Sequence, residues 1–216
     1  MGCTSLIDPP NLSSKELDGR CYRSMFSGCI GIKKAPSLPA LVLKNECYRY
    51  MFLGCTSLTT APELPATTLA NDCYQYMFYG CTNLTTVPEL PATTLAKYCY
   101  RSMFNGCSKL ANAPALPAPY LTSGCYMEMF YGCTSLVAAP DLPAQYLVSS
   151  CYKQMFYNCS KINRIKALFL VADTKMLASW LSGTAVKGTF IKDRNASWTT
   201  NSEANIPDGW MLVDAE

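Results

Sequence analysis

The sequence contains no histidine, and only 15% of its 216 residues are charged. Without an imidazole, the chain lacks the usual general base near neutral pH and the commonest protein ligand for metal ions. We therefore expect no enzyme, and no pair of a nucleophile and a base stands out elsewhere in the sequence. The formal net charge of +3 is too small to indicate a nucleic acid as partner.

Long hydrophobic runs are also missing. No apolar stretch approaches the roughly 18 residues needed to cross a bilayer, and no basic segment followed by an apolar one marks a secretory signal. Half of the residues are nevertheless apolar, which is typical of an ordered chain with a core. We expect a folded protein with no membrane insertion in this stretch of chain.

Cysteine, by contrast, is abundant and regularly spaced. The gaps between the thirteen cysteines alternate between 18 and 8 residues, so the pattern repeats every 26 residues without an insertion. A Cys-Tyr pair and a Met-Phe pair follow the same step. A fixed period of 20 to 50 residues is typical of a solenoid, in which each unit forms one coil that stacks on the next. The units are 3–28, 29–54, 55–80, 81–106, 107–132, 133–158 and a partial seventh.

Each unit combines a strand-like and a helix-like part. In the third unit, the residues around Leu58 favour a short strand that ends at Pro62, because proline cannot donate to a sheet ladder. The segment NDCYQYMFYG, residues 71–80, predicts one or two helical turns capped by Asp72 and stopped at Gly80. Stacked coils would bury about eight apolar side chains each. These are Leu58, Ala61, Leu64, Leu69, Cys73, Met77, Phe78 and Cys81.

The two ends of the chain depart from the repeat. Residues 1–168 form the solenoid, and we interpret residues 169–216 as a small α+β cap over the last coil, with an independent binding domain as the alternative. In this segment we expect a helix from Asp173 to Leu181 and short strands at 187–193 and 209–215. At the other end the chain begins in the middle of a unit, which predicts further domains upstream in the native protein.

The unit resembles the cysteine-containing leucine-rich repeats of the BspA type. The shared features are Gly54-Cys55, Leu58-x-x-Ala61, Leu64-Pro65 and Met77-Phe78. The 26-residue length, the added Pro62 and the Cys-Tyr pair depart from the family pattern. The resemblance implies an α/β repeat solenoid, a right-handed coil of six to seven units with short parallel strands and short helical turns.

The resemblance also implies a function. Proteins of this kind lie on the surface of gut and oral bacteria, bind matrix proteins and mediate attachment. We therefore expect a non-enzymatic adhesion module, at the cell surface or secreted, that recognises a protein or glycan and needs no cofactor and no metal. The alternative is a structural spacer that displays another domain and has no ligand of its own.

Two columns of the repeat are candidates for the binding surface. The tyrosine column is either a stacked, half-buried aromatic ladder or a row of exposed rings that contacts a partner, supplemented by Tyr50, Tyr76, Tyr79, Tyr131 and Tyr157. An arginine column lies beside it and adds a mild basic stripe. The tyrosines are Tyr22, Tyr48, Tyr74, Tyr100, Tyr126 and Tyr152. The arginines are Arg23, Arg49 and Arg101.

The cysteines allow three interpretations. They can form two ladders of small core side chains, as unpaired cysteine commonly does. They can form disulfides within units, for example Cys21 with Cys29, although an odd count leaves at least one free. They can also form a soft-metal or redox ladder, although the clustered Cys-x-x-Cys spacing of metal sites is absent from the sequence.

Overall fold

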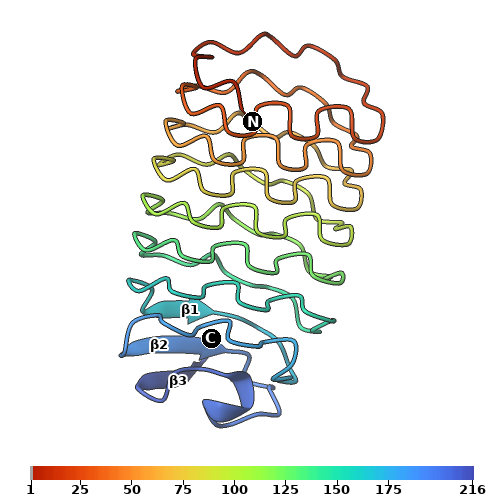
Figure 1. Cartoon of the computed structure of the whole chain (residues 1–216). Coiled ribbons are helices and arrows are strands. Elements are labelled where there is room, and N and C mark those ends of the chain that lie inside the picture. Colours follow the sequence, from red (N-terminus) through yellow and green to blue (C-terminus); the bar gives the residue numbers. More distant parts are fainter. Residues whose placement is uncertain (1) are drawn as a thin grey trace.

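The computed structural model describes residues 2–216 as a stack of coils along one axis (Figure 1). The N-terminal coil lies at one end of the stack, and three strands lie at the other. Isolated parallel bridges join residues one period apart in neighbouring coils, such as Lys34 with Thr60 and Thr60 with Thr86. The solenoid with a 26-residue period that the cysteine spacing predicts is therefore confirmed.

Regular strands occur only at the C-terminal end of the described residues. They are β1 (Arg164–Lys166), β2 (Gly188–Lys192) and β3 (Trp210–Asp214), which form a parallel sheet in the order β1-β2-β3. The two strands expected at 187–193 and 209–215 are thus confirmed. A short 3-10 helix, η1 (Ser202–Ala204), lies between β2 and β3. The earlier coils make only single bridges on this side.

The expected helical turns are wrong, because residues 2–216 contain no α-helix. The corresponding segments form runs of consecutive turns, visible as the regular zigzag of the trace in Figure 1. We call these segments the turn ribbons. They are 19–28, 45–54, 71–80, 97–106, 123–132 and 149–158.

The hydrogen bonds explain why a turn ribbon is not a helix. A helix would send each N–H to the carbonyl four residues earlier. Here alternate N–H groups bond three residues back, as Met51 does to Tyr48 at 3.2 Å. The others donate to the next coil, as Tyr48 does to Cys73 at 3.0 Å and Phe52 does to Met77 at 2.9 Å. Half of the ribbon's donors therefore hold neighbouring coils together.

Backbone conformation enforces this pattern. Every fourth ribbon residue has a positive φ, as at Asp72 (58°), Tyr76 (57°) and Gly80 (71°). A left-handed residue interrupts a right-handed helix, and for a residue other than glycine it costs roughly 1–2 kcal/mol. Asp72 is therefore not the helix cap that the sequence predicts. The bonds between coils offset this cost, because these three residues each donate their N–H to the following coil.

The core consists of columns of identical side chains. The phenylalanine rings stack at centroid distances of 5.6–5.7 Å from Phe26 to Phe156. Of the eight side chains expected inside the third coil, six are at most 2% exposed. Ala61 and Leu69 are partly buried and pack against the others. The predicted core is thus confirmed, with Tyr74 as an additional member.

All thirteen cysteines are free thiols, and eleven of them are buried. In one column the five thiols from Cys55 onward donate to a carbonyl of an earlier coil, as Cys55 does to Phe26 at 3.1 Å and Cys107 does to Phe78 at 3.2 Å. This bond satisfies the polar part of the thiol inside an apolar core. The structure therefore agrees with core ladders. The pair Cys21 and Cys29 is not bridged.

The segment after residue 168 continues the stack. The helix expected from Asp173 is replaced by turns, because Ser179 has a φ of 52°. The side chain of Asp173 does accept the N–H groups of Lys175 and Met176, at 2.8 and 3.3 Å. Trp180 stacks on Tyr152 at 6.0 Å and so extends the tyrosine ladder by one step.

Three buried tryptophans close this end of the core. Each indole N–H donates to a backbone carbonyl: Trp180 to Ala204 at 2.8 Å, Trp198 to Phe169 at 3.3 Å, and Trp210 to Ala185 at 2.7 Å. The large apolar rings are therefore buried without leaving a polar group unpaired. The division at residue 168 stays a prediction.

Candidate binding surface

The tyrosine column predicted as a binding surface lies inside the solenoid. Five of its six rings are only 1–2% exposed, and neighbouring rings stack at 5.7–6.1 Å. Coils cover these rings on both sides, so a partner has no access to them. The binding-surface prediction is therefore wrong for these five residues, and only Tyr22 in the first coil is partly exposed. The five are Tyr48, Tyr74, Tyr100, Tyr126 and Tyr152.

The predicted arginine column does reach the surface. Arg23 is exposed, and Arg49 and Arg101 are half-buried. A four-residue rhythm explains the difference between the two columns. In ribbon 45–54, the Cys-Tyr and Met-Phe pairs are buried, whereas the pairs that follow them are partly exposed. Two residues inside alternate with two outside.

The same rhythm places another set of tyrosines on the outer side of the ribbons. Tyr50, Tyr76 and Tyr98 are partly exposed, and Tyr79 is 40% exposed. Sequence reasoning missed Tyr98, which falls in the column of Glu46 and Asp72. We call the following set the turn-face patch: Arg20, Arg23, Glu46, Arg49, Tyr50, Asp72, Tyr76, Tyr79, Tyr98 and Arg101.

Glu46 is the electrostatic centre of the patch. Its carboxylate accepts from Arg20 at 3.0 Å, Arg23 at 2.8 Å and Arg49 at 3.1 Å. Burial alone raises the pKa of Glu46, but hydrogen bonds from Arg20 and Arg49 and the charges of Arg20 and Arg23 outweigh it. The pKa of Glu46 therefore lies below its ordinary value. One carboxylate thus forms ion pairs with three guanidinium groups.

Cation–π contacts and ring stacking connect this cluster to the neighbouring coils. The guanidinium of Arg49 lies 4.9 Å from the ring centre of Tyr50, and the Tyr50 ring stacks on Tyr76 at 5.0 Å. Arg101 lies 5.6 Å from Tyr76 and 5.8 Å from Tyr98. Such contacts hold side chains that would otherwise move freely in solvent. The patch is therefore a continuous, ordered surface over four coils.

Three polar atoms beneath the patch lack a hydrogen-bond partner. They are Nε of Arg49, Oε1 of Gln75 and Nε of Arg101. All three are buried, one in each of three consecutive coils. Gln75 is only 2% exposed. Buried polar groups are normally paired in native proteins, whereas here two guanidinium donors and one amide acceptor stay unpaired.

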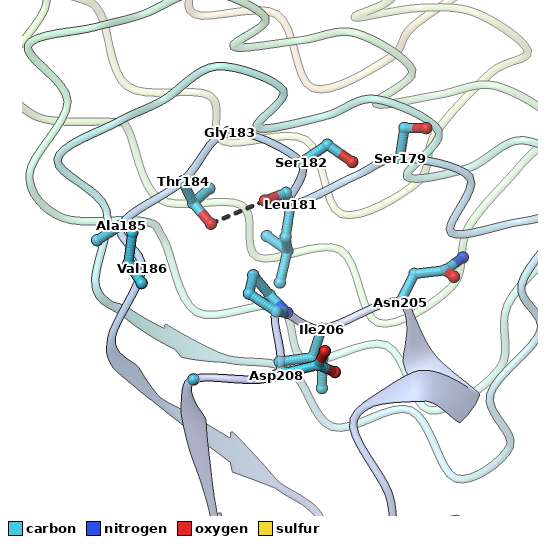
Figure 2. A pocket seen from close by; sticks show the side chains of 12 residues that line it. Ser179, Leu181, Ser182, Gly183, Thr184, Ala185, Val186, Asn205, Ile206 and Asp208 are labelled. Atoms are coloured by element: carbon cyan, nitrogen blue, oxygen red, sulfur yellow. Dashed lines mark hydrogen bonds between the residues drawn. The ribbon is translucent and has the colours of Figure 1, made fainter.

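Among residues 2–216, no three His, Cys, Asp or Glu side chains come together as a metal site would require. A hollow of about 590 Å³ lies between residues 179–186 and 205–209 (Figure 2). The Thr184 hydroxyl at its edge donates to the Leu181 carbonyl at 2.8 Å. The Asn205 amide bonds to the carbonyls of Thr174 and Leu177.

Few polar groups of this hollow are free to bind a substrate. The side chains of Thr184 and Asn205 donate to backbone carbonyls, and the remaining polar side chains are two serines and Asp208. A substrate pocket needs several polar groups that converge on one point. Within the described residues, no helix has the length and hydropathy to cross a bilayer.

Comparisons with known proteins gave one match. The family model described as "BspA type Leucine rich repeat region" matches residues 22–163 in six copies. This span covers more than half of the chain and includes most of the turn-face patch. Neither the curated proteins nor the solved structures gave a match.

Proposed function

Because the chain belongs to the BspA-type leucine-rich repeat family, we propose that it is a non-enzymatic binding module that contacts a protein partner through the turn-face patch. Such a module works at the bacterial cell surface or outside the cell, where it mediates adhesion. The observation that carries the proposal is the ordered cluster of tyrosine and arginine side chains across four coils.

Tyrosine and arginine are the residue types that protein interfaces favour. They are enriched in the core of interfaces and among the few residues that carry most of the binding energy. In the patch their side chains are already held by stacking and ion pairs, so binding costs less conformational entropy than it would for free side chains. Tyr79, at 40% exposure, is the most exposed ring of the patch.

A protein partner fits the ring orientation better than a glycan does. Tyr50 and Tyr76 are nearly parallel, with 12° between their planes, and the Arg49 guanidinium lies over the Tyr50 ring. Their faces are therefore covered by each other and by a guanidinium group. The ring edges and hydroxyls remain for a partner. Sugars would need an open ring face to stack on.

The spacer alternative predicts a surface without a contiguous aromatic patch, since a spacer has no ligand. The ordered patch favours binding over display. In addition, the patch residues vary from coil to coil, whereas the core columns beneath them are uniform: Tyr50 and Tyr76 share their column with Ser24 and Ser102. Variation on a constant scaffold is what a specific contact surface requires.

Residues at equivalent positions in other coils suggest substitutions that test this function. We expect the triple variant Tyr50→Ser, Tyr76→Ser and Tyr79→Asn to fold, because Ser24, Ser102 and Asn105 occupy the same columns. Its affinity for a protein partner should fall at least tenfold, as expected for the loss of interface hot spots. The measurement is biolayer interferometry against a panel of purified matrix proteins and bacterial surface proteins.

The control replaces exposed tyrosines on another edge of the solenoid. Tyr120 and Tyr146 are 77% and 66% exposed, and their column contains Thr94. The variant Tyr120→Thr with Tyr146→Thr should bind as the native chain does. Equal loss in both variants would contradict the assignment to the turn face. Absence of binding to every protein on the panel would favour the spacer.

A further inference from the structure

We propose that the partner presents carboxylates to the turn-face patch, in an acidic, extended protein segment that lies across the stacked coils. This inference rests on the proposed function and specifies the chemistry of the partner at the same site. Three observations carry it: where the net charge lies, which charges are already paired, and which part of each ring faces outward.

The turn ribbons carry a net positive charge. Each taken with the residue before it, they contain seven Lys and Arg and four Asp and Glu, an excess of three. The turn-face patch within them combines four arginines with two carboxylates, Glu46 and Asp72. A surface with a net positive charge attracts a partner of opposite charge.

The carboxylates of this face do not neutralise it. Glu46 is shared by three arginines, so its single negative charge leaves two guanidinium charges in that cluster. Glu128 lies 4.0 Å from Arg101 and also accepts the Ser102 hydroxyl at 2.7 Å. Burial raises the pKa of the Asp72 carboxyl, and the nearby charge of Glu46 raises it further, whereas Arg49 and Arg101 lower it.

The aromatic rings of the patch also favour a negatively charged partner. Stacking covers the negative faces of Tyr50 and Tyr76, so that their positive edges remain at the surface. Guanidinium N–H groups and ring edges all favour an acceptor with negative charge. Arginine geometry matches carboxylate and phosphate, and the carboxylate is the one that unmodified protein side chains carry.

The test uses two synthetic probes that differ only in charge. One is a rhodamine-labelled peptide of six Glu-Ser repeats, and the other has six Gln-Ser repeats. Fluorescence anisotropy with the full chain should show binding of the Glu peptide and none of the Gln peptide. The affinity should fall as salt is raised, because ion pairs at a surface are screened.

Matched variants locate the binding. The double variant Arg49→Gln with Arg101→Gln should lower the affinity for the Glu peptide at least tenfold. The fold should tolerate both substitutions, because Gln75 occupies the same column. The control Lys109→Gln with Lys161→Gln removes the same charge from exposed positions outside the ribbons and should leave affinity unchanged. Equal losses in both variants would overturn the proposal, since binding would then depend on net charge alone.

Two further outcomes separate this proposal from the function on which it rests. Binding of an oligogalacturonate, which carries carboxylates on sugars, without binding of the Glu peptide would overturn the protein partner in favour of an acidic glycan. If neither probe binds but the Tyr50, Tyr76 and Tyr79 variant still loses its protein partner, the acidic segment is wrong and the binding face stands. If no variant affects any binding, both proposals fail.

Discussion

Raising the pH from about 8 to about 10 should unfold the solenoid cooperatively. The cause is the cysteine ladders. Burial raises the pKa of the Cys47 and Cys151 thiols to about 11 and that of the Cys55, Cys125 and Cys159 thiols to about 12. Five further thiols are raised in the same direction. In the unfolded chain, thiols ionise near pH 8.5.

The sign of the effect follows from proton binding. Below about pH 8.5 both states keep their thiol protons, and the stability is fully present. Above it the unfolded chain releases protons while the folded core retains them, so stability falls as pH rises toward the folded pKa values. Each buried thiol costs on the order of 1 kcal/mol by pH 10. Ten such thiols together cost on the order of 10 kcal/mol, comparable to the whole stability of a domain.

Urea unfolding followed by tyrosine fluorescence at pH 7, 8, 9 and 10, under a reducing agent, measures this dependence. A control variant with Cys73→Ala, Cys99→Ala and Cys125→Ala removes three of the ten thiols. Its stability should fall less steeply with pH, whatever its stability at neutral pH. A native chain that is equally stable at pH 8 and pH 10 would contradict the buried, protonated ladders.

Replacing Phe104 with alanine should cost about 3–5 kcal/mol, the usual range for a fully buried phenylalanine. Phe104 is 0% exposed and stacks on Phe78 at 5.6 Å and on Phe130 at 5.7 Å. The cavity would interrupt the ladder in the middle of the stack. Because each coil contacts only its neighbours, the two halves should then unfold in separate transitions.

The same substitution at the first coil is the matched control. Phe26 is 3% exposed and stacks only on Phe52, at 5.6 Å. Phe26→Ala should therefore cost less than Phe104→Ala and leave a single main transition. Differential scanning calorimetry measures both effects. Equal costs at the two positions would show that stacking on both sides does not contribute to stability as described.

The period of the sequence predicts the stack of coils and its core correctly. The thirteen cysteines and the Met-Phe pairs repeat without an insertion, which is typical of a stack of equal coils. The match to the BspA-type model confirms the resemblance drawn from the repeat motif. The burial of the tryptophans and the strands near 188–192 and 210–214 are also predictable, because apolar residues cluster where the period stops.

The helical turns could not be excluded from local sequence. Cys73 and Met77 are four residues apart, a spacing that suits a helix as well as a ribbon of turns. The deciding interaction is the N–H of every second residue with the carbonyl of the next coil. Propensity within one unit contains no information about that bond. A left-handed Asp72 or Tyr76 is therefore visible only in the stacked structure.

Burial of the tyrosine and arginine columns is predicted only in part, for the same reason. Under a helical period, Tyr74 and its equivalents fall on the margin between core and solvent. Under the four-residue rhythm of the ribbon, they lie inside with the cysteines, and Arg49 and Tyr50 lie outside. Uniformity within the repeat was a usable signal: the invariant column is the core, and the variable columns form the surface.

Hydroxyl-radical footprinting of the native chain, read by mass spectrometry of its peptides, distinguishes the two sets of tyrosines. We expect strong modification of Tyr79 and measurable modification of Tyr50, Tyr76 and Tyr98, whose rings reach the surface. The ladder tyrosines Tyr74 and Tyr100, at 1% exposure, should stay protected until the chain is denatured. Equal modification of the ladder and the patch in the native chain would contradict the division of the tyrosines into core and binding surface.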